Sequence, residues 1–167
     1  MFRPPQEFER IVMPEAPRLI RFARRLTGGT PASEDLVQET LLKAWRSFHQ
    51  FTRDSNARAW LYRILINEYH GQGRKIRASP AMVPLGRANS TPIERLEMNQ
   101  ALDSLPLEQR SVLLLAVVEG FTCREVSEIL SVPIGTVMSR LSRARQALRE
   151  KLATDGSVAA VAHGQKD

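Results

Sequence analysis

Apolar residues recur at helical spacing near the C-terminal end of the chain. They lie three or four positions apart at Val137, Leu141, Ala144, Leu148 and Leu152. At about 100° per residue these positions form one stripe along a helix, which we expect to be buried. The outward positions carry small polar side chains, cations and one methionine, at Met138, Ser139, Arg140, Ser142, Arg143, Arg145 and Arg149. Such a helix can bind DNA phosphates with its flanks and base edges with its centre.

The preceding residues predict a shorter helix that leads into this one. Thr122 and Glu125 have the spacing of a capping box, which satisfies two amide groups at a helix start. Pro133 follows shortly afterwards, where the first turn of the next helix tolerates a missing amide hydrogen. Two helices with this short connection are typical of a helix-turn-helix. An ordinary helical hairpin with a solvated basic face remains an alternative.

The rest of the chain also predicts helices, and little of it predicts strand. Periodic apolar positions indicate helices over 8–27, kinked at Pro14 and Pro17, over 31–48, and from 56 to about 74. Residues 78–95 contain three prolines and no sustained period, which is typical of a flexible linker. We therefore expect an all-α fold of two small helical domains. The predicted ranges are 1–77 and 96–152 for the domains, 78–95 for the linker and 153–167 for a disordered tail.

The predicted helix over 35–48 has two distinct faces. Its core-facing positions are Val37, Thr40, Leu41, Ala44 and Phe48, with Leu36 and Trp45 at the edges. The outer face mixes both charges around one leucine, at Asp35, Gln38, Glu39, Leu42, Lys43 and Arg46. An apolar centre with a polar rim is typical of a protein-protein contact. A solvated face with one exposed leucine remains an equal alternative.

The segment over 51–75 combines aromatic and cationic residues. Its cations include Arg53, Arg58 and Arg63, and flat or amide side chains lie among them. Single-stranded nucleic acid binds such surfaces, because bases stack on rings while the backbone follows positive charge. We expect Trp60 to be core and the polar loop over 52–58 to be exposed.

Composition narrows the function further. The net charge of +6 and pI near 10.2 indicate a polyanionic partner. Cys123 is the only cysteine, and His49, His70 and His163 lack metal-ligand spacing, so we expect neither a disulfide nor a metal site. The sequence shows no nucleophile paired with a base, no carboxylate dyad and no Gly-rich phosphate loop, so we expect no catalytic residues and no cofactor. No signal peptide or membrane span is evident, which predicts a cytoplasmic protein.

Five segments with distinctive sequences follow one another along the chain. DLVQETLLKAWRSF, ARAWLYRILINEY, a Pro-rich segment, LDSLPLEQRSVLLLAVVEGFTCREVSEIL and GTVMSRLSRARQALREKL follow one another. This order, over roughly residues 7–152, resembles the bacterial extracytoplasmic-function (ECF) sigma factors. The resemblance implies a promoter-melting domain, σ2, and an upstream-element-binding domain, σ4. It implies as partners core RNA polymerase, through the β′ clamp and β flap, promoter DNA and an anti-sigma factor.

The resemblance also implies roles for individual residues. The polymerase-docking positions are Asp35, Gln38, Glu39, Leu42 and Arg46, and the downstream-element positions are Arg53, Asp54, Asn56, Arg58, Arg63 and Asn67. Met138, Ser139, Ser142 and Arg143 match the positions that read the upstream element, with Arg140, Arg145 and Arg149 beside them. Met138 departs from the family pattern, where Lys or Arg is common. A polymerase-independent helix-turn-helix regulator and a sigma-like adaptor that sequesters a protein remain alternatives.

Overall fold

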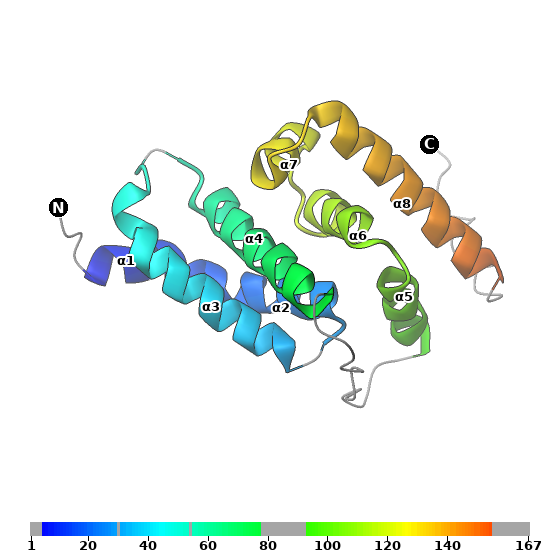
Figure 1. Ribbon diagram of the computed structural model, residues 1–167, viewed down its shortest axis with the longest axis horizontal. Coiled ribbons are helices and arrows are strands. Elements are labelled where there is room, and N and C mark those ends of the chain that lie inside the picture. The colour runs from blue at the N-terminus through cyan, green and yellow to red at the C-terminus, as the bar shows by residue number, and fades with distance from the viewer. Residues whose placement is uncertain (1–4, 30, 54, 78–92, 155–167) are drawn as a thin grey trace, which may run out of the picture.

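The structure, a computed structural model, describes residues 5–29, 31–53, 55–77 and 93–154 (Figure 1). The described residues form helices and no strand, which confirms the all-α prediction. In chain order the elements are α1 (Pro5–Val12), η1 (Met13–Glu15), α2 (Ala16–Thr27), α3 (Ala32–Ser47), η2 (Phe48–Gln50), α4 (Ala57–Arg77), α5 (Ile93–Asp103), α6 (Leu107–Leu113), η3 (Leu114–Val118), α7 (Cys123–Leu130) and α8 (Ile134–Thr154). Figure 1 shows α1 to α4 as one group and α5 to α8 as a second group beside it.

The N-terminal group has the breaks that its prolines and glycines predict. Pro14 lies in the 3₁₀ turn η1 between α1 and α2, because a proline inside a helix removes a hydrogen bond. Gly28 ends α2 in the left-handed conformation, with φ 80°, which glycine adopts without steric cost. Helix α3 packs against both α2 and α4. The break at Pro14 and the end of this first helical segment are therefore confirmed, whereas Pro17 lies in the first turn of α2, where proline is tolerated.

Both groups contribute to one cluster of buried apolar residues. Phe22, Leu26 and Tyr62 belong to it from the first group, and Leu114 and Val126 from the second. Helix α4 packs against α7, while α2 packs against α5 and η3. The two helical groups thus bury apolar surface against each other, which excludes that surface from water.

Three boundaries or positions differ from the sequence prediction. Helix α5 begins at Ile93, inside the range predicted as linker, and the rest of that range lies outside the described residues. Helix α8 continues to Thr154, and the remainder of the predicted tail is likewise not described. Trp45 was expected at the edge of the core, but 40% of it is exposed. Phe8 and Phe48 occupy that part of the core, and the Trp45 ring only meets Phe8 edge-on at 5.0 Å.

Candidate functional site

The helix-turn-helix has the local geometry that the sequence predicts. The Thr122 hydroxyl accepts a hydrogen bond from the Glu125 amide at 3.2 Å, and the Glu125 carboxylate accepts one from the Thr122 amide at 2.8 Å. These two bonds form a complete capping box at the start of α7. Ser131 then turns the chain in the left-handed conformation, with φ 54°. The turn is stabilised by a bond from the Ser127 hydroxyl to the Val132 carbonyl at 2.6 Å.

Helix α8 separates its faces as its periodicity predicts. Val137, Leu141 and Ala144 are buried, whereas Leu148 is partly buried against the same core. The outward residues expected to contact DNA are accessible: Met138, Ser139, Ser142, Arg143, Arg145 and Arg149 are exposed, and Arg140 is half-buried. Cations therefore line an accessible helix surface, which can bind phosphates.

Helix α3 presents a second accessible surface, which we call the docking face. It consists of Asp35, Gln38, Glu39, Leu42 and Arg46, all of them exposed. Leu42 is 47% exposed, in agreement with its predicted outward position. The exposed Trp45 lies three positions further along the same helix and enlarges the apolar part of this surface. Sequence reasoning missed Trp45, because the angular pattern placed it at the edge of the core-facing side.

Most of the described residues that were predicted to bind the downstream element are exposed. Arg53 makes an ion pair with the buried Glu7, at 2.7 Å between Nε and Oε1. The Asn56 side chain accepts a hydrogen bond from the Ala59 amide at 3.1 Å, near the start of α4. Arg63 and Asn67 are exposed on α4, and Asp54 lies outside the described residues. Arg53 and Asn56 stay exposed despite these bonds, with 68% of the Arg53 side chain accessible.

Arg58 differs most from its prediction. The loop over 52–58 was expected to be exposed, but only 25% of the Arg58 side chain is accessible. Its Nη2 donates hydrogen bonds to the Glu119 backbone oxygen at 2.6 Å and to Glu119 Oε2 at 2.8 Å. Its guanidinium carbon lies 4.5 Å from the centre of the Phe121 ring, within the range of cation–π attraction. Packing of α4 against the second helical group partly buries Arg58, so its predicted exposure is wrong, whereas Thr52, Arg53, Ser55 and Asn56 of the same loop are exposed as predicted.

Tyr62 completes this contact between the two groups, which we call the Glu119 contact. Its hydroxyl donates a hydrogen bond to Glu119 Oε2 at 2.7 Å, and its ring meets Phe121 edge-on at 5.3 Å. Burial and the bond to Glu119 raise the pKa of Tyr62, so the phenol stays neutral. Burial alone would lower the pKa of Arg58, but interactions with Glu119 and Tyr62 outweigh it and raise this pKa. In the Glu119 contact, one carboxylate therefore pairs with the charged Arg58 and accepts a hydrogen bond from the neutral Tyr62.

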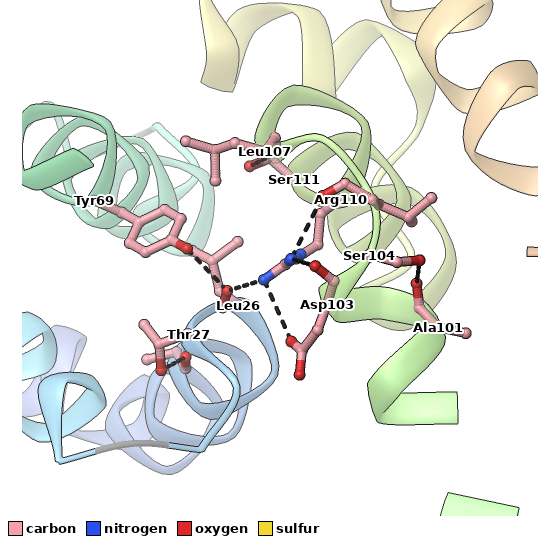
Figure 2. A network of polar contacts seen from close by, with 11 residues as sticks. Leu26, Thr27, Tyr69, Ala101, Asp103, Ser104, Leu107, Arg110 and Ser111 are labelled. Atoms are coloured by element: carbon pink, nitrogen blue, oxygen red, sulfur yellow. Dashed lines mark hydrogen bonds and ion pairs between the residues drawn. The ribbon is translucent and has the colours of Figure 1, made fainter. Parts of the chain in front are cut away.

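A second polar contact joins the groups at the C-terminal end of α2 (Figure 2). The Leu26 carbonyl accepts hydrogen bonds from the Tyr69 hydroxyl at 3.1 Å and from Arg110 Nη1 at 2.9 Å. Arg110 Nη1 also lies 3.4 Å from an Asp103 carboxylate oxygen. The last carbonyls of a helix lack partners within the helix and attract cations. Arg110 and Tyr69 satisfy this need from two different elements.

The space between the two helical groups is lined mostly by apolar and cationic side chains. A cavity of about 680 Å³ lies between α2 and the α5–η3 segment. Its one carboxylate, Asp103, is paired with Arg110. Within the described ranges no group of three His, Cys, Asp or Glu side chains could hold a metal ion. None of the described helices is long and apolar enough to cross a membrane.

Comparison with known proteins identifies the family. Two family models match the chain, Sigma-70 region 2 over residues 11–77 and Sigma-70 region 4 over residues 95–148. The ECF RNA polymerase sigma factor EcfG of Rhodopseudomonas palustris is 36% identical over 154 residues, covering 87% of this chain and 85% of that protein. The chain belongs to the ECF sigma factors. This family directs transcription initiation by RNA polymerase and is not a family of enzymes.

Other ECF sigma factors support the same assignment. SigE of Mycolicibacterium smegmatis is 36% identical over 163 residues, which cover 90% of this chain and 63% of that longer protein. The sigma factor RpoE of Bartonella quintana, solved in complex with the anti-sigma factor NepR, has a TM-score of 0.77 and 34% identity. That comparison covers 90% of this chain and 99% of the solved chain. The expected family is thus confirmed in sequence and in fold.

Proposed function

We propose that this ECF sigma factor recognises promoters through three separate surfaces. The docking face of α3 binds core RNA polymerase at the β′ clamp, the region around Arg58 on α4 captures an unpaired downstream strand, and α8 reads the upstream element as duplex. The second helical group adds a contact to the β flap. The observation that carries the proposal is the outward face of α8, where exposed Ser139, Ser142 and Arg143 lie between flanking arginines. Flanking cations fix a helix on DNA, and central polar groups distinguish bases.

The docking face supports a protein contact and not a DNA contact. It carries Asp35 and Glu39 as well as Arg46, so its charge is mixed and would repel phosphates in part. The exposed Leu42 and Trp45 supply the apolar centre that protein interfaces use. Polymerase binding is therefore assigned to α3.

The proposed strand-capturing role of Arg58 requires a change in the arrangement of the two helical groups. In the structure both Glu119 and Phe121 engage its guanidinium. A DNA strand can reach this group only after the Glu119 contact opens. Arg63 and Asn67 are already exposed, but they lie five and nine positions after Arg58 and so face the opposite side of α4, where they offer a separate contact to the strand.

Regulation and location complete the proposal. An anti-sigma factor is proposed as a regulator, because the similar sigma factor of Bartonella quintana was solved with one. The protein acts in the cytoplasm, where RNA polymerase operates, and has no enzymatic activity of its own. The polymerase supplies the chemistry.

A titration of core RNA polymerase tests the docking assignment. Leu42→Arg places a charge at the centre of the proposed interface, so it should weaken binding by on the order of 2 kcal/mol. Met13→Arg is a matched control, because Met13 has a similar exposure of 49% and belongs to η1 and not to the docking face of α3. Both variants should melt like the wild type, since each changes an exposed side chain. If Leu42→Arg binds core RNA polymerase with unchanged affinity and melts like the wild type, α3 does not dock on the polymerase. A regulator that acts without polymerase would then be favoured.

A further inference from the structure

Two exposed apolar side chains occupy the first turns of α8. Ile134 is 47% exposed and Met138 is 58% exposed. They lie four positions apart, so they share one face of the helix, and Ser142 continues the same line. The outward face of α8 is thus apolar at its N-terminal end and polar with cations further along. Neither helix packing nor the core accounts for this apolar pair.

The position of the pair determines what it can meet on DNA. The N-terminal residues of a recognition helix are those that contact base edges in the major groove. Most groups on those edges are hydrogen-bond donors or acceptors, which an isoleucine side chain cannot bind. The thymine C5-methyl group is the apolar exception. A pair of apolar side chains at this place therefore fits thymine methyl groups.

We propose that Ile134 and Met138 determine promoter specificity by contacting thymine methyl groups in the upstream element. The inference rests on the proposed function, in which α8 reads duplex DNA. The charges around the pair favour DNA as the occupant over an apolar protein surface. Arg140, Arg143 and Arg145 follow the pair on the same helix, and burying them against a protein would require compensating carboxylates. Phosphates supply that compensation on both sides of the groove.

The test uses the full chain bound to core RNA polymerase and a promoter duplex selected from a library with a randomised upstream element. Each thymine of the selected element is replaced singly by deoxyuridine, which removes only the methyl group. At one or two thymines the replacement should weaken binding about fourfold, which corresponds to about 0.8 kcal/mol for one buried carbon group. In Met138→Ala or Ile134→Ala the same replacement should have no further effect, because the two changes remove one contact.

Met13→Ala serves as the control, since it removes a methionine that is also well exposed (49%) but belongs to η1 and not to α8, and it should keep the full deoxyuridine effect. Arg143→Ala separates this inference from the function on which it rests. If Arg143→Ala weakens specific binding but deoxyuridine has no effect at any position, α8 still reads DNA and the methyl contact is refuted. If deoxyuridine weakens binding equally in wild type and in both alanine variants, another residue reads the methyl. If selected and scrambled duplexes bind alike, the proposed function fails and the inference fails with it.

Discussion

The Glu119 contact gives the sharpest prediction about stability. Only 8% of the Glu119 side chain is accessible, and its carboxylate receives hydrogen bonds from Arg58 and Tyr62. Glu119→Ala removes this acceptor but leaves the bond from Arg58 to the backbone oxygen of residue 119. The variant therefore leaves a buried hydroxyl without its partner and removes the nearer counter-charge of Arg58, while Glu15 Oε2 remains 4.0 Å from Arg58 Nε.

The structure allows the cost to be estimated for each partner. Tyr62 is fully buried, so an unsatisfied hydroxyl there should cost about 1–3 kcal/mol. Arg58 keeps a quarter of its side chain accessible to water, which screens its charge, so the lost pair adds about 1 kcal/mol or less. We expect Glu119→Ala to lower the free energy of unfolding by about 1–4 kcal/mol in total.

Urea unfolding followed by tryptophan fluorescence measures this loss. Glu128→Ala is the matched control, because Glu128 is exposed on α7 and its removal should change stability by no more than about 0.5 kcal/mol. Combining Glu119→Ala with Tyr62→Phe completes a double-mutant cycle, in which we expect a coupling of at least about 0.5 kcal/mol. A loss no larger than that of Glu128→Ala, together with no coupling to Tyr62, would refute the stabilising role of the contact.

Two further predictions concern titration and DNA binding. The chain has two tyrosines, Tyr62 and Tyr69, and burial raises the pKa of both. Because the folded pKa values exceed the unfolded value of about 10, this contribution to stability is complete below about pH 10 and is lost as the pH rises through the folded pKa values. Phenolate absorbance should therefore appear at higher pH in the folded protein than in the protein unfolded by urea, and coincident titration curves would contradict the prediction. Arg143→Ala should cost about 1–3 kcal/mol on the specific upstream element and relax one base position, whereas Arg149→Ala should weaken all duplexes alike and reduce the salt slope by about one. Equal losses of Arg143→Ala on specific and random duplex in a binding titration would exclude it as a base reader.

Local signals account for the parts of the fold that the sequence predicts well. Thr122 and Glu125 place the start of α7 because a capping box needs only residues three positions apart. Gly28 marks the end of α2 for a similarly local reason. The outward positions of Leu42 and Arg143 follow from helical periodicity, which the buried stripes of α3 and α8 confirm. Their roles in binding polymerase and DNA stay predictions.

Contacts between distant segments could not be predicted in the same way. Arg58 and Glu119 are 61 positions apart, and no periodic pattern connects them. The polar composition around Arg58 indicated exposure, but packing of the second helical group reverses it. The sequence does contain one hint about Glu119, which directly follows the apolar run LLLAVV. A carboxylate next to the core needs a polar partner. That signal indicates burial without identifying Arg58.

Arg58 binds Glu119 in the structure and a DNA strand in its proposed role, so promoter binding would depend on the fraction of molecules in which the Glu119 contact is open. Arg58 cannot hold Glu119 and a DNA strand at once, so in its proposed role only molecules with an open contact can bind the strand. The apparent dissociation constant equals the intrinsic one divided by the open fraction, so with about one molecule in a hundred open, binding is about a hundredfold weaker. Glu119 and Tyr62 would then set the amount of sigma factor needed to start transcription. Sequence changes at these two positions would alter the dose response of every target promoter while the recognised DNA sequence stayed the same.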